Sequence, residues 1–119
     1  NSAVDAANTS PGNAPSAITV GATDQSDNLS YFSNFGWGLD VLAPGSAILS
    51  CYNDGPNRYA QMSGTSMASP IVAGMVACIM SSSTKLCSTP DQYVQKLYSD
   101  LSSTTVFVNA KGVLKPLAY

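Results

Sequence analysis

Short apolar runs separated by turn-forming residues make up the first half of the chain. The runs are residues 17–22, 39–43 and 47–50, and a fourth short segment follows at 58–62. Gly21 closes the first run and Pro44-Gly45 closes the second. Each run has the length of a strand and lacks alternating polar positions, which is typical of strands buried on both faces. The pattern therefore predicts an α/β layer structure with a mainly parallel sheet.

The residues around these runs are predicted to be loops. Residues 1–16 are rich in Asn, Ser, Ala, Pro and Gly and show no periodicity. Residues 31–38 interleave aromatic side chains with turn formers. Aromatic residues in such a loop are expected to close the underside of a core, and a platform for a ligand is the alternative.

Two helices are expected in the second half. Residues 66–80 begin with small and hydroxyl side chains and become apolar, and Pro70 fits near a helix start, where backbone N–H groups have no internal partner. Their many small residues predict a helix packed on several sides. Thr89-Pro90 opens a second helix, whose apolar side chains recur at a spacing of three to four and predict a surface position. Residues 104–109 are expected to be extended, and residues 111–119 an irregular tail.

Ser66 stands at the predicted junction between a tight turn and the first helix. A hydroxyl at this position lies beside unpaired backbone N–H groups and at the positive end of the helix dipole. Such a serine is either a helix cap or a nucleophile. The stretch Gly64-Thr65-Ser66-Met67-Ala68 lacks the second glycine of the G-x-S-x-G elbow, which argues against an α/β-hydrolase.

Composition narrows the class of protein. The 119 residues form one domain at most, 45% are hydrophobic, and only 10% are charged. A net charge of −2 does not indicate the basic surface that binds nucleic acid, and no apolar stretch is long enough to span a membrane. The low charge suits a secreted or vacuolar protein. Because the chain starts within a loop and without Met, we expect a partial sequence or a processed chain.

The segment Gly64-Thr65-Ser66-Met67-Ala68-Ser69-Pro70, followed by Val72-Ala73-Gly74, closely resembles the nucleophile segment of the subtilisin-like serine proteases. Further similar segments occur in the order of that family, at residues 17–22, 31–36, 39–45 and 48–50. These segments are most similar to those of the proteinase K branch and, within it, to those of fungal cerevisin-like enzymes. The resemblance implies part of a three-layer subtilisin-like α/β fold with a central helix starting at Ser66. Residues 1–119 would then be the C-terminal portion of the catalytic domain.

The resemblance also implies a reaction. Ser66 would attack a peptide carbonyl and form an acyl-enzyme, as in a serine endopeptidase. An asparagine side chain of the family donates to the oxyanion, and counting back along the similar loop places it at Asn1, with Asn8 as the nearest competitor. The catalytic aspartate and histidine of the family lie upstream of the serine, before this chain.

The isolated chain is expected to be inactive. It contains no histidine, and Asp5, Asp24 and Asp40 cannot replace a base of suitable pKa. Ile71 stands where the family usually has a histidine that is not the catalytic base. The alternative hypothesis is therefore an inactive fragment or degenerate relative that acts as a binding or antigenic protein.

The same resemblance implies a structural calcium ion and several partners. In the proteinase K branch, carbonyls matching Pro15 and Ala17 and a carboxylate matching Asp40 hold calcium, and oxygen ligands of this kind suit a hard cation. The alternative is that Asp40 only accepts hydrogen bonds from loop amides. No cofactor is required for the chemistry. The implied partners are polypeptide substrates, the upstream part of the same catalytic domain, and a propeptide or proteinaceous inhibitor.

Overall fold

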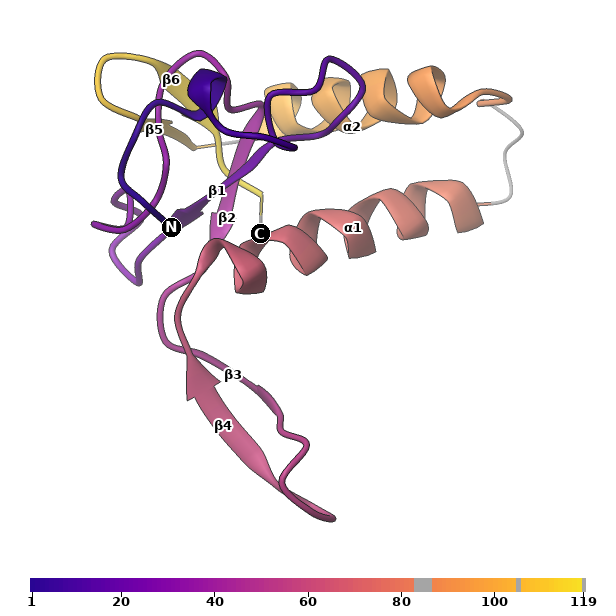
Figure 1. Cartoon of the computed structure of the whole chain (residues 1–119). Coiled ribbons are helices and arrows are strands. Elements are labelled where there is room, and N and C mark those ends of the chain that lie inside the picture. Colours follow the sequence, from indigo (N-terminus) through magenta and orange to yellow (C-terminus); the bar gives the residue numbers. More distant parts are fainter. Residues whose placement is uncertain (83–86, 105, 119) are drawn as a thin grey trace.

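The computed structural model describes residues 1–82, 87–104 and 106–118 (Figure 1). The first half contains a 3₁₀ turn and four strands: η1 (Ala6–Asn8), β1 (Val20–Thr23), β2 (Val41–Pro44), β3 (Ile48–Cys51) and β4 (Tyr59–Met62). The second half contains α1 (Thr65–Ser81), α2 (Pro90–Thr104), β5 (Phe107–Asn109) and β6 (Leu114–Pro116). All four predicted strands and both predicted helices are present, with ends that differ by a few residues.

A parallel strand pair and two helices form the main core. Strand β1 pairs with β2 in parallel, from Val20 opposite Val41 to Thr23 opposite Pro44. Helix α1 packs on both strands and on α2 (Figure 1). Their buried residues are Ala22, Val41, Ala43, Ala68, Val72, Leu97, Leu101 and Ala118. Because the strands are apolar on both faces, helix α1 and the N-terminal loops can each cover part of the pair.

Helix α1 is packed less tightly than its composition predicts. Only Ala68 and Val72 of this helix are buried. A Cβ added to Gly74 would meet no atom within 4 Å. The prediction of packing on several sides is thus wrong for the described part of the chain, because one side of α1 contacts the sheet and α2 while the small residues elsewhere on the helix face solvent.

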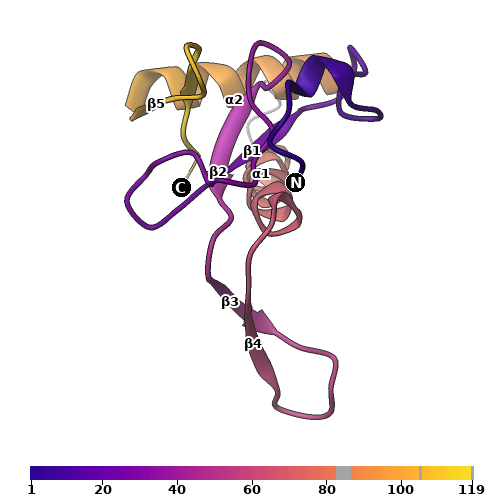
Figure 2. The same ribbon diagram turned by 60° about the vertical axis from the view of Figure 1, so that its left-hand side comes forward.

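Strands β3 and β4 form a hairpin that extends away from the core in both views (Figures 1 and 2). The pairing is antiparallel and runs from Ile48 opposite Met62 to Cys51 opposite Tyr59. Leu49 and Tyr59 are exposed on it. The hairpin leads directly into the turn before α1, so it connects the parallel pair to Ser66.

The last residues are ordered into a second hairpin, so the predicted irregular tail is wrong. Strands β5 and β6 pair antiparallel, and Lys111 and Gly112 at the turn both have positive φ, as a two-residue hairpin turn requires. Leu117 then bridges to Leu42 of β2 and is fully buried. Since α2 continues to Thr104, the extended segment begins at Phe107 rather than at residue 104.

The aromatic loop divides its side chains between core and surface. Phe32 and Phe35 are partly buried against the two hydrophobic clusters, as expected for residues that close a core. Tyr31 and Trp37 are exposed. The three cysteines, Cys51, Cys78 and Cys87, are all unpaired.

Candidate active site

The turn before Ser66 is held by backbone contacts. Gly64 is the N-cap of α1 and is fully extended, with φ 162° and ψ 160° and no side-chain cap hydrogen bond. Its N–H donates to the Gly45 carbonyl at 2.7 Å, and its carbonyl accepts from Met67 N–H at 3.0 Å. Ser66 is therefore the second residue of the helix and not its cap. It is exposed in the first turn of α1, between Thr65 and Met67, whose N–H groups donate to Asn1 Oδ1 and to the Gly64 carbonyl.

Gly45 has to be glycine because two main-chain segments meet there. A Cβ at this position would lie 2.6 Å from the Ala22 Cβ and 2.8 Å from the Gly64 carbonyl oxygen. Both distances are shorter than any ordinary contact. The close approach sets the turn before Ser66 directly against the end of strand β1.

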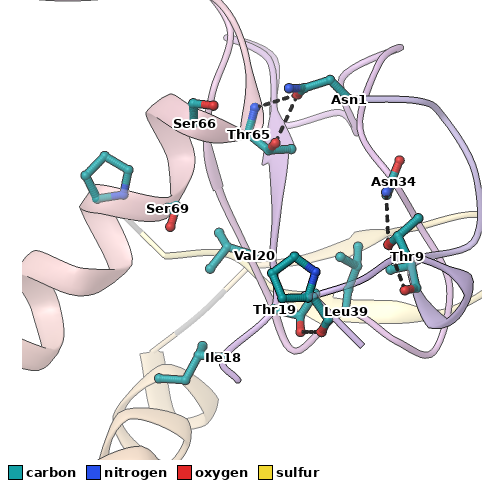
Figure 3. Close-up of a pocket in the computed structure, with 14 residues that line it drawn as sticks. Asn1, Thr9, Ile18, Thr19, Val20, Asn34, Leu39, Thr65, Ser66 and Ser69 are labelled. Carbon is teal, nitrogen blue, oxygen red and sulfur yellow. Dashed lines mark hydrogen bonds between the residues drawn. The ribbon is translucent and has the colours of Figure 1, made fainter. Parts of the chain in front are cut away.

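Asn1 lies at the same turn, 64 residues away in sequence. Its side-chain oxygen accepts hydrogen bonds from the Thr65 N–H at 2.8 Å and from the Thr65 hydroxyl at 3.0 Å (Figure 3). A backbone N–H can only donate, so the Asn1 atom that faces it must be oxygen. The Asn1 NH₂ group is consequently left as a donor next to Ser66.

The N-terminal residues are tied to the aromatic loop, and this places Asn1. The Asn34 side-chain oxygen accepts from the Ser2 and Val4 N–H groups at 3.1 and 3.4 Å. Ala3 N–H donates to the Phe32 carbonyl at 3.1 Å. Asn8, the competing candidate, lies in η1 and is not among the residues that share a cavity with Ser66.

Two cavities flank Ser66. The first is lined by Asn1, Thr65 and Ser69 together with residues of the loop before β1 (Figure 3). The second lies between the β3–β4 hairpin and the start of α1 and is mostly apolar, with Leu49 and Ile71 among its walls. Ser66 is thus reachable from both sides of the helix start.

Within the described residues, nothing hydrogen-bonds to the Ser66 hydroxyl, and the three candidate aspartates are occupied elsewhere. Asp5 Oδ1 accepts from Ala7 N–H at 2.9 Å, and Asp24 Oδ1 accepts from two N–H groups of its own turn. Asp40 Oδ2 accepts from Thr19 N–H at 2.7 Å. Within the described residues, none of these three carboxylates hydrogen-bonds to Ser66.

Asp40 lines neither of the cavities beside Ser66 but lies beside the two other residues of the predicted calcium site. Pro15, Ala17 and Asp40 line one cavity together with Tyr98 of α2. Burial raises the pKa of Tyr98 to about 12, and the negative charge and hydrogen bond of Asp40 add to the effect. No group of three or more His, Cys, Asp or Glu side chains that could hold a metal occurs in the described residues.

Comparison with known proteins identifies the family of the chain. The model of the subtilase family, Peptidase S8, matches residues 2–113. The chain belongs to the subtilase family. This subtilase chain is 46% identical to Proteinase T of Parengyodontium album over 101 residues, which are 85% of the chain and 34% of that protein. It is 54% identical over 77 residues to cerevisin of Saccharomyces cerevisiae, covering 65% of the chain and 12% of cerevisin.

The fold of the chain is also similar to that of a solved structure. The whole subtilase chain superposes on 42% of a cold-adapted subtilisin-like serine proteinase, with a TM-score of 0.83 and 43% identity. This confirms the predicted subtilisin-like α/β class. The chain spans about a third of the length of Proteinase T and less than half of this solved protein. None of the helices in the described residues is long and apolar enough to cross a membrane.

Two of the residues described above, Thr65 and Tyr98, had no separate signal in the sequence. Thr65, which fixes the Asn1 amide, is a small hydroxyl residue within the motif and its partner is far away in sequence. Tyr98 lies in the second predicted helix, whose apolar side chains were identified only by their spacing. A signal was available there, since the hydroxyl of a partly buried tyrosine usually finds a polar partner.

Proposed function

We propose that this chain is the C-terminal portion, residues 1–119, of the catalytic domain of a serine endopeptidase, with Ser66 as its nucleophile. The family membership supports the protease class. The observation that carries the assignment to Ser66 is the pairing of an exposed serine at a helix start with an oriented amide donor, Asn1.

In the proposed mechanism, Ser66 Oγ attacks the carbonyl carbon of a peptide bond and gives its proton to a base. The oxyanion that forms is stabilised by Asn1 NH₂ and by the Ser66 N–H. Collapse of this intermediate expels the amine, and water then releases the acyl group from Ser66. The base is a histidine oriented by an aspartate, both on the upstream part of the domain. Residues 1–119 by themselves do not hydrolyse peptides.

The remaining assignments follow from the same proposal. The substrates are polypeptides, and a propeptide or a proteinaceous inhibitor would occupy the same cleft. The protein acts outside the cytosol, either secreted or in a vacuole. The chemistry needs no cofactor. A structural calcium ion would be held by the Pro15 and Ala17 carbonyls and the Asp40 carboxylate, which line one cavity.

The carbonyl groups fit this role. Among the hydrogen bonds of the described residues, neither the Pro15 nor the Ala17 carbonyl accepts one. A bound cation would give both oxygens a partner and would neutralise the Asp40 charge.

Labelling of the intact native protein by a fluorophosphonate tests the proposal, because the reagent reacts with activated serines only. We expect stoichiometric labelling on Ser66 and none in Ser66→Ala. Ser69→Ala is the matched control, since Ser69 lines the same cavity one turn later and should leave labelling unchanged. Absence of labelling in folded wild-type protein would instead support the alternative, an inactive relative that serves as a binding or antigenic protein.

A further inference from the structure

Two tripeptides of the chain have the pattern that accepts an N-linked sugar in secreted proteins. They are Asn8-Thr9-Ser10 and Asn28-Leu29-Ser30, and neither has proline in the middle. A pattern of three residues also arises by chance. The structure is therefore needed to show whether either asparagine is free to carry a sugar.

Asn28 stands at the end of an exposed turn that does not use its side chain. The Asp24 carboxylate holds this turn, because its Oδ1 accepts from the Ser26 N–H at 2.9 Å and from the Asn28 N–H at 3.0 Å. The Asn28 carbonyl accepts from the Asp24 N–H at 2.9 Å. Both main-chain groups of Asn28 are thus paired, whereas its side-chain amide is exposed and has no hydrogen bond to any described residue. A sugar on this nitrogen would break no contact of the fold.

The turn also lies outside the proposed substrate cleft. None of residues 24–31 lines either cavity beside Ser66. Leu29 bridges to Thr23, and the Ser30 N–H donates to the Ala22 carbonyl at 2.9 Å, so the segment is fixed to the end of β1. A sugar on Asn28 would therefore extend into solvent from a fixed segment that borders neither cavity.

The other tripeptide is placed less favourably. Asn8 is exposed too, but Pro11 follows its tripeptide directly, so the chain lacks an N–H there and has a fixed φ. Thr9 and Pro11 also line the first cavity beside Ser66. A sugar on Asn8 would adjoin the proposed cleft.

We propose that Asn28, and not Asn8, carries an N-linked oligosaccharide. In the transfer, the Asn28 side-chain nitrogen attacks C1 of the first sugar of a lipid-linked oligosaccharide diphosphate. The new bond from nitrogen to C1 replaces the bond from C1 to the diphosphate oxygen, the lipid diphosphate leaves, and the amide gives up one proton. Donors of this class act in the secretory pathway, so the inference rests on the secreted or vacuolar location proposed above.

Ser30 determines when the transfer can take place. The acceptor pattern requires its hydroxyl. In the folded protein, however, Ser30 is only 3% exposed, and its Oγ lies 2.8 Å from the Ser46 Oγ in a hydrogen bond. A transferase cannot reach a hydroxyl that is buried in this way. The sugar must therefore be added before this segment folds.

Peptide mapping of the intact native protein tests the proposal. An N-glycosidase that releases the sugar in heavy-oxygen water turns the modified asparagine into an isotopically marked aspartate. We expect the mark at Asn28 and none at Asn8. Asn28→Gln should lose one glycosidase-sensitive step in electrophoretic mobility, and the matched control Asn8→Gln should keep it. Asn28→Gln should also be labelled on Ser66 at the wild-type rate, since Asn28 borders neither cavity.

Three outcomes would overturn the proposal. An unmarked Asn28 in protein recovered from the medium or the vacuole would refute the site and leave the location standing. A mark at Asn8 would refute the distinction between the two tripeptides. Retention of unmodified protein in the cytosol would refute both the location and the sugar. Where Asn28→Gln fails to fold, mapping of the wild type decides, because it needs no variant. Labelling of Ser66 tests the proposed protease function separately.

Discussion

Replacing Gly45 by alanine is the sharpest available test of how the turn before Ser66 is built. The new Cβ would lie 2.6 Å from the Ala22 Cβ and 2.8 Å from the Gly64 carbonyl oxygen. Neither atom belongs to a flexible side chain. The Gly64 carbonyl also accepts from Met67 N–H in the first turn of α1, so moving it disturbs the helix start.

The size of the effect follows from these contacts. Normal carbon–carbon contacts are about 3.5–4.0 Å, so the backbone must shift by roughly 1 Å to relieve the clash. Inserting one methyl group into a packed site costs typically 1–3 kcal/mol, and the upper end applies here because two main-chain segments must separate. A shift of about 1 Å at the reacting group also lowers the rate of a positioned reaction by on the order of 100-fold.

The assay compares the free energy of unfolding in urea with the rate of fluorophosphonate labelling of the intact protein. Gly45→Ala should lose about 3 kcal/mol of stability and about 100-fold in labelling rate. The matched control is Gly12→Ala, whose Cβ would make only ordinary contacts at 3.5 Å or more, and which should change either quantity little. Native stability and labelling in Gly45→Ala would refute the account of the turn.

Three further results are expected. Thr65→Val keeps the N–H donor to Asn1 but loses the hydroxyl donor, so labelling of Ser66 should slow by roughly fivefold, about 1 kcal/mol, and an unchanged rate would contradict the role of Thr65. Folding raises the pKa of Tyr98 from 10.0 to about 12, so the stability that this residue contributes is complete below pH 10 and is lost between pH 10 and 12. Because Tyr98 is partly exposed, the expected loss is reduced to about 1 kcal/mol. In urea unfolding over that pH range, wild type should lose this much more free energy of unfolding than Tyr98→Phe, and an equal loss in both proteins would contradict the shift. Leu117→Ala empties a fully buried position in the second cluster and should cost about 2–5 kcal/mol in the same assay, whereas a loss below 1 kcal/mol would mean that the C-terminal strand is not part of the core.

Local signals account for the parts of the fold that could be predicted. The start of α1 follows from small residues and Pro70, and β1 and β2 follow from short apolar runs bounded by turn formers. The pairing of Leu117 with Leu42 joins residues 75 positions apart, and no local pattern encodes it. The turn at Lys111-Gly112, which would have predicted the C-terminal hairpin, was missed because only the glycine of the pair indicates a positive φ.

In the candidate site, too, local sequence patterns predicted some residues, and contacts between distant segments determined the others. Ser66 could be placed from its own segment, and Asn1 was assigned only through resemblance to a family, because its contact with Thr65 spans the chain. The packing of α1 was predicted incorrectly since small residues indicate close neighbours without saying which segment provides them. Tyr98 was missed because periodicity assigns a residue to a helix face but does not identify the partner of its hydroxyl.

The contact between Asn1 and Thr65 has a mechanical consequence. The amide is attached to the residue directly before Ser66, through two hydrogen bonds to that one residue. When the start of α1 moves, Thr65 carries the amide along with the serine. The spacing between the two groups therefore depends on a span of one residue. In the proposed mechanism, attack on the carbonyl and stabilisation of its oxygen would therefore stay together when this end of the helix is displaced.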